Sequence, residues 1–172
     1  MEKRKISLNT ISAADETIML DILTNNIVKQ TYMLPDYECR EDAIPLFHRL
    51  ITLSMDQTRY VRGIYLGDIL IGFVNDVEIK NRTIELGYVI HPRYHGNGYM
   101  TQVLKTAIKN LFTAGFDEII TGAFEENLAS IRVMEKAGMT RLEKTEEIEY
   151  RGRIHNCIYY HVVSSGDARV LH

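Results

Sequence analysis

Long apolar runs are absent from this sequence of 172 residues. A membrane-spanning helix needs roughly 18 consecutive apolar residues, and no segment approaches that length. The first ten residues, MEKRKISLNT, are charged, and the apolar stretch of a secretory signal peptide does not follow them. The sequence therefore predicts neither a membrane span nor a membrane partner.

Cysteine and metal-ligand patterns are also scarce. The two cysteines, Cys39 and Cys157, lie far apart and form no C-x-x-C pair. This favours two ordinary thiols, buried or half-buried, in a reducing compartment over a disulfide. The six histidines show no metal-ligand spacing such as H-E-x-x-H. We therefore expect a cytoplasmic protein without a metal site.

An excess of basic charge is missing as well. The formal net charge of −3 argues against tight nonspecific binding of nucleic acid, which needs a basic face. Hydrophobic residues make up 45% and charged residues 25%, as in ordinary globular proteins. Repeats, low-complexity segments and flexible linkers are absent. We therefore expect a single domain over residues 1–172, with residues 164–172 as a loose tail.

Apolar spacing in the N-terminal part predicts two helices. Ser12 is placed to cap the first helix, and Asp15, three residues later, resembles the acidic partner of a capping box. The segment Thr31–Arg40 contains a proline and an aspartate at its middle and is interpreted as a loop. A second helix is expected from about Asp42, because apolar residues then recur at helical spacing.

A period of two follows the second helix and predicts strands. Two strands are expected to form a hairpin that turns at Gly67-Asp68. The segment TIELGYVI, Thr83–Ile90, alternates as another strand. His91-Pro92 ends that strand, because proline cannot donate a hydrogen bond to a strand partner.

A glycine-containing segment, RYHGNGYM, leads from this strand into a helix with apolar residues at spacings of three and four, from Met100 to Phe112. Gly115 closes the helix, and Glu118–Phe124 is expected to form a strand. A unit of strand, turn, helix and strand favours a parallel pair.

The remaining sequence predicts one more helix and a hairpin. The helix begins at the cap Asn127, runs to about Ala137 and stops at Gly138. The hairpin spans residues 142–163 and turns near Gly152. These patterns together predict an α/β fold with a mixed sheet.

The turn that carries Gly96 and Gly98 is a candidate anion site. Glycines in a loop that enters a helix allow several backbone N–H groups to point at one anion, such as a pyrophosphate. The pattern R-x-x-G-x-G is neither a Rossmann nor a Walker motif. The alternative is a tight strand-to-helix turn that needs glycine for its geometry alone.

Two segments resemble motifs of the GNAT superfamily of N-acetyltransferases. ELGYVIHPRYHGNGYM resembles its acetyl-CoA-binding motif, Q/R-x-x-G-x-G/A, with Arg93, Gly96 and Gly98 at the defining positions. ENLASIRVMEKAGM, residues 126–139, resembles the second cofactor-contacting segment. The resemblance covers Ile69–Val163 and is closest to the branch that acetylates the N-terminal alanine or serine of ribosomal proteins.

The resemblance implies the GNAT fold, in which helices flank a mixed central sheet and acetyl-CoA binds at the splayed strands. It implies pantetheine contacts to the backbone of Val89 and Ile90, and pyrophosphate contacts to the amides from His95 to Met100. Asn127 and Ser130 are expected to contact pantetheine or the phosphate end of CoA. The implied cofactor-binding residues are Val89, Ile90, Arg93, His95, Gly96, Asn97, Gly98, Tyr99, Met100, Asn127 and Ser130.

Several of these residues have plainer interpretations. Asn127 is also suited to a helix cap alone, and Ser130 to a position in the first turn of a helix. The His95 side chain is interpreted as an exposed residue at the rim of the site, and His91 likewise receives no functional role.

The resemblance further implies transfer of the acetyl group from acetyl-CoA to a primary amine, by direct attack in a ternary complex. Glu85 is the candidate base, because it shares a strand face with Gly87 and Val89. The alternative is an exposed strand glutamate. Many relatives carry a tyrosine as general acid where this chain has Met134, so the thiolate needs another donor, such as Tyr99, Tyr150 or water.

The acceptor is not identified by the sequence. A protein N-terminus, as in a ribosomal protein, follows from the branch resemblance. The alternatives are a small amine, such as a polyamine, aminoglycoside or amino-acid derivative, and a CoA-binding module with little catalysis. Tyr32, Asp36 and Tyr37 lie in the loop that lines the acceptor slot of relatives, where an acidic group suits a cationic amine. The resemblance is compatible with a homodimer.

Overall fold

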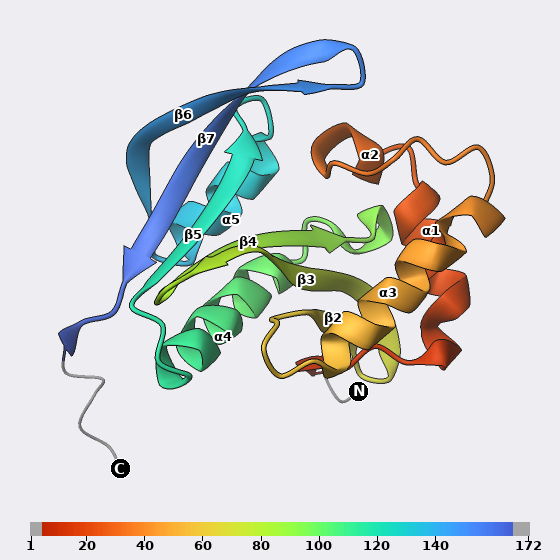
Figure 1. Ribbon diagram of the computed structural model, residues 1–172, viewed down its shortest axis with the longest axis horizontal. Helices are drawn as coiled ribbons and strands as arrows, with labels where there is room; N and C mark the ends of the chain where they lie inside the picture. The colour runs from red at the N-terminus through yellow and green to blue at the C-terminus, as the bar shows by residue number, and fades with distance from the viewer. Residues whose placement is uncertain (1–4, 167–172) are drawn as a thin grey trace. The chain divides into compact units, whose positions relative to one another are not determined.

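The computed structural model describes residues 5–166, and Figure 1 shows its ribbon. The strands form hydrogen-bonded neighbours in the order β1-β2-β3-β4-β5-β7-β6. The chain divides into two compact units. The first unit contains the residues up to Asp76 together with Tyr88–Tyr99, and the second contains Val77–Gly87 and the residues from Met100 onward. The expected α/β fold with a mixed sheet is confirmed, because parallel and antiparallel pairs both occur.

The first unit contains β1, β2, parts of β3 and β4, and the N-terminal helices. Its elements are β1 (Ile6–Asn9), η1 (Ala13–Asp15), α1 (Glu16–Thr24), α2 (Val28–Thr31), η2 (Glu41–Ala43), α3 (Ile44–Met55), β2 (Arg62–Leu66), the first part of β3 (Ile69–Lys80), the last part of β4 (Thr83–Ile90) and η3 (Pro92–Tyr94).

The capping box at the first helix is confirmed. The Ser12 hydroxyl accepts a hydrogen bond from the amide of Ala14 at 3.2 Å, and the Asp15 carboxylate accepts one from the amide of Ser12 at 2.9 Å. The Tyr65 hydroxyl donates to the same carboxylate at 2.6 Å, which ties the start of the helix to β2. The cap therefore fixes where the apolar face of α1 begins.

Two short elements of the first unit were not expected from the sequence. β1 has only four residues, too few to show a clear strand pattern in the sequence. Its strand conformation depends on pairing with β2, from Ile6–Leu66 to Asn9–Gly63. α2 is a single turn, which the Asn25 side chain starts by accepting from the amide of Ile27 at 2.9 Å. The expected loop at Thr31–Arg40 therefore begins one residue later, because Thr31 ends α2.

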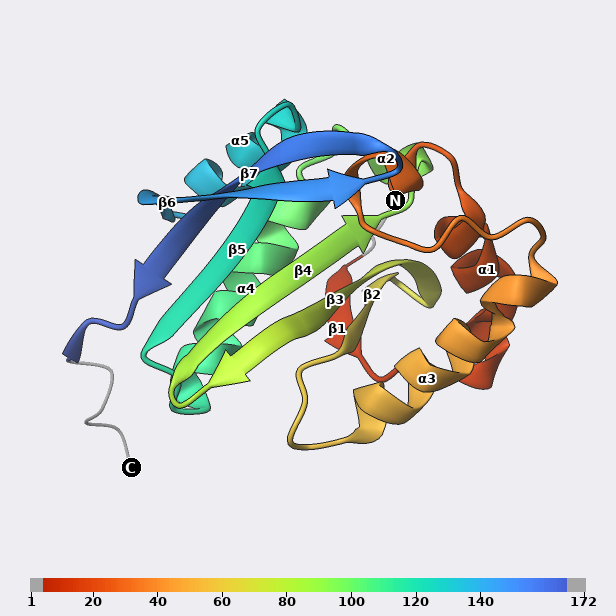
Figure 2. The same ribbon diagram turned by 45° about the horizontal axis from the view of Figure 1, so that its top comes forward.

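The second unit is built on the strand that follows the long helix. Its elements are the last part of β3, the first part of β4, α4 (Tyr99–Thr113, of which this unit contains the residues from Met100), β5 (Glu118–Phe124), α5 (Leu128–Lys136), β6 (Thr140–Tyr150) and β7 (Arg153–Val163). β5 lies between β4 and β7, as Figure 2 shows. The expected hairpin of β6 and β7 is present and turns at Gly152, and the part of the expected tail at residues 167–172 lies outside the described residues.

The pairing of β4 with β5 is parallel, as the sequence predicts. The pairs run from Thr83–Glu118 to Leu86–Thr121. Both strands continue further, to Ile90 and to Phe124, beyond the last of these pairs. Beyond Thr121, β5 continues to pair with β7, as far as the pair Phe124–Cys157.

Candidate active site

The glycine turn presents unpaired amides at the start of a long helix. Gly96 and Gly98 have φ angles of 75° and 74°, and α4, which has 15 residues, begins directly after them. Within residues 5–166, no acceptor pairs with the amides of Gly96, Asn97 or Gly98. The Asn97 side chain braces the turn by donating to the carbonyls of Tyr94 at 3.2 Å and His95 at 3.0 Å. Free N–H groups beside a helix N-terminus fit the pyrophosphate of a nucleotide cofactor.

His95 ties this turn back to the end of β4. Its Nε2 lies 3.0 Å from the carbonyl oxygen of Ile90, and because a carbonyl only accepts, Nε2 carries the proton. The side chain is exposed, as the sequence analysis expected. Val89 lies opposite Gly72, where a Cβ would collide with the Val89 carbonyl, so glycine allows β3 to approach β4 closely.

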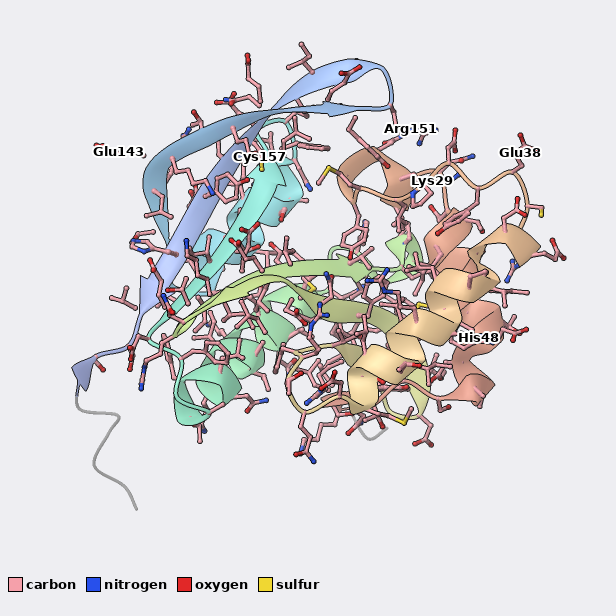
Figure 3. The ribbon with its side chains drawn as sticks, in the orientation of Figure 1. Lys29, Glu38, His48, Glu143, Arg151 and Cys157 are labelled. Carbon is pink, nitrogen blue, oxygen red and sulfur yellow. The ribbon has the colours of Figure 1, made fainter. Side chains whose placement is uncertain are left out.

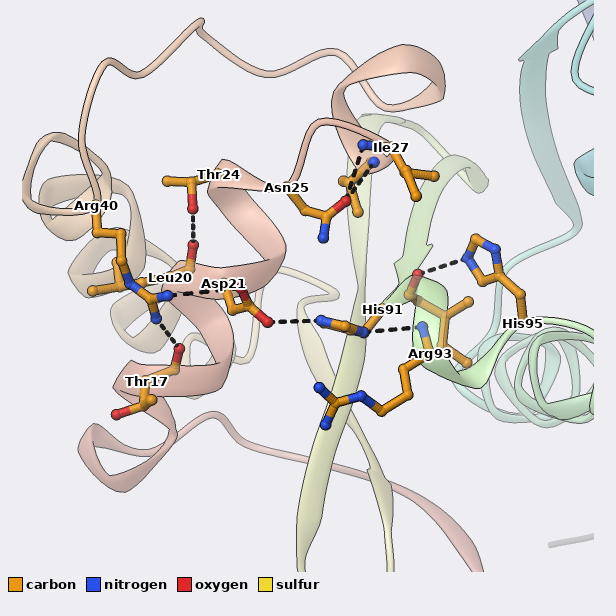
Figure 4. Close-up of polar contacts among 12 residues, drawn as sticks. Thr17, Leu20, Asp21, Thr24, Asn25, Ile27, Arg40, His91, Arg93 and His95 are labelled. Atoms are coloured by element: carbon orange, nitrogen blue, oxygen red, sulfur yellow. Dashed lines mark hydrogen bonds and ion pairs between the residues drawn. The ribbon is translucent and has the colours of Figure 1, made fainter.

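His91 is buried and forms a link between α1 and the turn, a structural contact that was not expected from the sequence. Figure 4 shows its Nδ1 accepting from the amide of Arg93 at 3.1 Å and its Nε2 donating to the carboxylate of Asp21 at 2.8 Å. Arg40 lies on the far side of that carboxylate at 3.7 Å and donates to the carbonyl of Thr17 at 2.6 Å. His91 therefore fixes the residue that starts the R-x-x-G-x-G segment.

Glu85, in the second unit, lies in a partly desolvated and mainly acidic setting. Burial is the largest effect and raises the pKa of its carboxyl group. The positive charge of Lys144 lowers that pKa, and the negative charges of Glu78 and Glu146 raise it. A carboxylate with a raised pKa accepts a proton more readily near neutral pH, as a general base requires.

The side chains around Glu85 come in part from β6 and β7, whose pairing register no local sequence pattern predicts. The Tyr159 hydroxyl donates to the Glu146 carboxylate at 2.8 Å, and the Lys144 ammonium lies 4.1 Å from the centre of the Tyr159 ring. A Cβ at Gly122 would lie 2.8 Å from that ring, so glycine makes room for it. Cys157, labelled on β7 in Figure 3, is buried, and its thiol pKa is raised by that burial and also by the charge of Glu85.

Asn127 caps α5 and keeps donors for a ligand. Its Oδ1 accepts from the amide of Ser130 at 3.2 Å. The cap interpretation is therefore confirmed, yet it uses only the oxygen of the amide group. Within residues 5–166, no acceptor pairs with the Nδ2 group of Asn127, so this donor suits a carbonyl of the pantetheine arm.

Comparison with known proteins identifies the family. Residues 5–140 match the acetyltransferase (GNAT) domain. The chain belongs to the GNAT family. It is an acetyl-CoA-dependent N-acetyltransferase. The uncharacterized N-acetyltransferase YoaA of Bacillus subtilis (strain 168) is 27% identical over 146 residues, which are 82% of each chain.

Solved structures share the GNAT fold. The acetyl transferase from Salmonella typhimurium that modifies the N-terminal serine of ribosomal protein L7/L12 has a TM-score of 0.80 and 17% identity, over 93% of this chain and 95% of the other. The spermidine N-acetyltransferase from Vibrio cholerae, in complex with CoA and spermine, has a TM-score of 0.77 and 20% identity, over 92% and 95%. Among residues 5–166, no helix has the length and apolar character needed to cross a membrane.

The cofactor residues expected of this GNAT enzyme fall in both units. Those from Val89 to Tyr99 belong to the first unit, while Met100, Asn127 and Ser130 belong to the second, as does the candidate base Glu85. Met100 is buried on the apolar face of α4, whereas Arg93 is exposed.

Met134, where many family members have a tyrosine, is a core residue of the enzyme, with no exposed surface. Its side chain belongs to the packing of α5 and has no proton to donate. A donor to the leaving thiolate must therefore come from another element or from water.

Two of the loop residues expected to line the acceptor slot, Tyr32 and Asp36, form polar contacts within the first unit. The Asp36 carboxylate pairs with the ammonium of Lys29 at 2.9 Å, and the Lys29 side chain is only 4% exposed. Tyr32 donates from its hydroxyl to Asn75 at 2.7 Å. The charge of Asp36 is therefore balanced within the protein, which weakens its case as the group that attracts a cationic amine.

The cysteines of the GNAT enzyme are both free, and Cys39 is exposed instead of half-buried. Residues 5–166 contain no group of three or more metal-binding side chains of the His, Cys, Asp or Glu type.

Replacing His91 with alanine is expected to lower the free energy of unfolding by about 1–3 kcal/mol, because Asp21 and the amide of Arg93 lose their partner in a buried setting. The KM for acetyl-CoA should rise severalfold as the turn loosens. Urea unfolding and steady-state kinetics measure the two effects, with His48→Ala, at an exposed position on α3, as the control. An unchanged KM would contradict the role given to His91.

Proposed function

We propose that this enzyme acetylates the α-amino group of a protein or peptide N-terminus, with Glu85 as the base. The observation that carries the base assignment is the half-buried carboxylate of Glu85, whose pKa is raised by burial and by two neighbouring glutamates. The acceptor assignment is supported by the structural likeness to the acetyltransferase that modifies the N-terminal serine of ribosomal protein L7/L12.

Acetyl-CoA binding is assigned to three groups of residues. The amides from Gly96 to Tyr99 and the N-terminus of α4 hold the pyrophosphate, and the exposed guanidinium of Arg93 adds positive charge beside them. In the first unit, the backbone of Val89 and Ile90 is assigned to the pantetheine arm. In the second unit, the Nδ2 group of Asn127 is assigned a contact to the cofactor. Acetyl-CoA, when bound, supplies the acetyl group as a thioester.

The chemistry begins with the acceptor, because an ammonium group has no lone pair to attack with. Glu85 takes a proton from the ammonium, directly or through a water molecule. The neutral amine then attacks the acetyl carbon, so that the N–C bond forms and the C–S bond breaks. The amine loses its second proton and the thiolate gains one, giving an amide and a free thiol. Neither cysteine takes part, because the thiol pKa of each is raised, that of Cys157 chiefly by burial.

A small polyamine is the second candidate acceptor. The negative charges of Glu78 and Glu146 act on Glu85, and so does the positive charge of Lys144, which gives this setting an excess of negative charge. Such a setting attracts a cation. The likeness to a spermidine N-acetyltransferase supports the same alternative.

Thiol release from acetyl-CoA distinguishes the candidates. We expect an N-terminal serine or alanine peptide to give a kcat/KM at least about tenfold above that of spermidine, because differential contacts of a few kcal/mol separate substrate classes. A lysine peptide with a blocked N-terminus serves as the control for side-chain acetylation. Turnover with spermidine and none with any peptide would overturn the acceptor assignment and leave the transferase intact.

A further inference from the structure

Two histidine–glutamate bridges hold β7, one to the first residue of β5 and the other to the turn that follows β5. At one end the Nδ1 of His155 lies 2.6 Å from the Glu126 carboxylate. At the other end the Nδ1 of His161 lies 2.6 Å from the Glu118 carboxylate. Because a carboxylate accepts, each Nδ1 carries a proton and donates it into the bridge. The two bridges have the same chemistry and length, and they differ in what lies next to them.

The bridge of His155 is part of a larger set of contacts on the turn between β5 and α5. The amide of Glu125 donates to the carbonyl of Asn156 at 2.8 Å, and the Asn156 side chain donates back to the Glu125 carboxylate at 3.0 Å. The His155 ring also stacks on Phe124, with ring centres 4.2 Å apart and an angle of 15°. His155 is buried, with 8% of its surface exposed. Strand β7 therefore holds three consecutive residues, Phe124 at the end of β5 and Glu125 and Glu126 in the turn.

The next residue in the turn is Asn127. Its amide donates to the carbonyl of Phe124 at 2.8 Å, and its side chain caps α5 at the amide of Ser130. The backbone of Asn127 is thus attached to the segment that His155 holds. Any movement of Glu126 or Phe124 relative to β7 also moves the Nδ2 group of Asn127.

We propose that His155 is a positioning residue that sets the affinity for acetyl-CoA by holding Asn127 in place through Glu126 and Phe124. The inference rests on the cofactor role proposed for Asn127. His155 does not take part in proton transfer in this account. Its loss therefore weakens cofactor binding and leaves the chemical step unchanged.

Equilibrium binding of coenzyme A, measured by calorimetry on the full-length protein, tests the inference. His155→Ala should raise the Kd about three- to tenfold, the range expected when one hydrogen bond is lost. His161→Ala removes the matched bridge at the far end of the strands and should leave the Kd within about twofold. His155→Asn keeps an N–H donor near the position of Nδ1 and should recover most of the affinity.

A double-substitution cycle separates positioning from general loss of stability. If His155 acts through Asn127, then His155→Ala should change the Kd little once Asn127 is already alanine. Steady-state kinetics should show the same effect as a higher KM for acetyl-CoA, with kcat and the KM for the acceptor nearly unchanged.

Each of four results would overturn the inference. Equal Kd values for His155→Ala and His161→Ala would show that the bridge to Glu126 affects cofactor affinity no more than the bridge to Glu118. Additive effects of His155→Ala and Asn127→Ala would show that His155 does not act through Asn127. An unchanged Kd for Asn127→Ala would remove the cofactor role of Asn127 together with the inference. A raised Kd for Asn127→Ala beside an unchanged Kd for His155→Ala would remove only the inference.

Discussion

Glu85→Gln is expected to lower kcat by about 100-fold or more, because the variant cannot take the proton from the acceptor ammonium. Coenzyme A should bind to the variant as it does to the wild type, since the amide replaces only the charge. Calorimetry and thiol release measure binding and turnover separately. A kcat within about threefold of the wild-type value would contradict the base assignment.

The assignment of Glu85 as the base also predicts the direction in which activity changes with pH. Acceptance of a proton requires ionised Glu85, so kcat/KM for the acceptor should fall as the pH drops through its raised pKa. Glu78→Gln removes a negative charge that raises this pKa, so the fall should move to lower pH. Lys144→Gln removes a positive charge that lowers the pKa, so the fall should move to higher pH. Movement in the wrong direction would contradict the electrostatic description.

Stability provides a control for Glu85→Gln. The folded-state pKa of Glu85 is raised, so ionisation of this group disfavours the folded state once the pH exceeds the unfolded-state value. That cost is absent at low pH and fully present above the folded-state pKa. Glutamine removes it, so the variant should be no less stable than the wild type at neutral pH. Lost activity in a stable variant cannot then be ascribed to unfolding.

Gly98→Ala is expected to raise the KM and the Kd for acetyl-CoA by about tenfold or more. The φ angle of Gly98 is 74°, which costs a residue with a Cβ about 1–2 kcal/mol. The turn relieves this strain by changing the direction of its amides, and each misdirected N–H weakens its bond to the pyrophosphate. A Cβ at Gly98 meets no atom within 4 Å, so a clash inside the protein does not explain the loss.

Gly115→Ala is the matched control for this prediction. Gly115 follows the other end of α4, has a φ angle of 102°, and likewise leaves open space for a Cβ. Urea unfolding should show a similar loss of stability in both variants, while calorimetry with coenzyme A should show weaker binding for Gly98→Ala alone. Equal affinities would mean that the glycine turn does not bind the pyrophosphate.

Local patterns made much of the fold predictable. The glycine turn, the apolar face of α4 and the parallel return of β5 depend on residues close together in the sequence, and all three are confirmed. The capping box of Ser12 and Asp15 is equally local. β1 was missed because four residues carry too little periodicity, and α2 because a single turn depends on the Asn25 side chain.

The surroundings of the candidate site depend on contacts that no local pattern contains. His91 and Asp21 are 70 positions apart, and the bond between them requires β4 and α1 to meet. The contacts of Tyr159 with Glu146 require the register of β6 on β7, which shifts between Arg141 and Thr145. A one-residue error in that register would move these side chains to the other face of the sheet.

The central claim is that this enzyme transfers an acetyl group to an α-amine. Its most direct test is mass spectrometry of a single peptide that carries both a free N-terminal serine and an internal lysine, after incubation with acetyl-CoA and the enzyme. We predict one added acetyl group, located by fragmentation on the N-terminal nitrogen, and none with Glu85→Gln over the same time. Acetylation of the lysine alone, or an unmodified peptide beside acetylated spermidine in a parallel reaction, would contradict the claim.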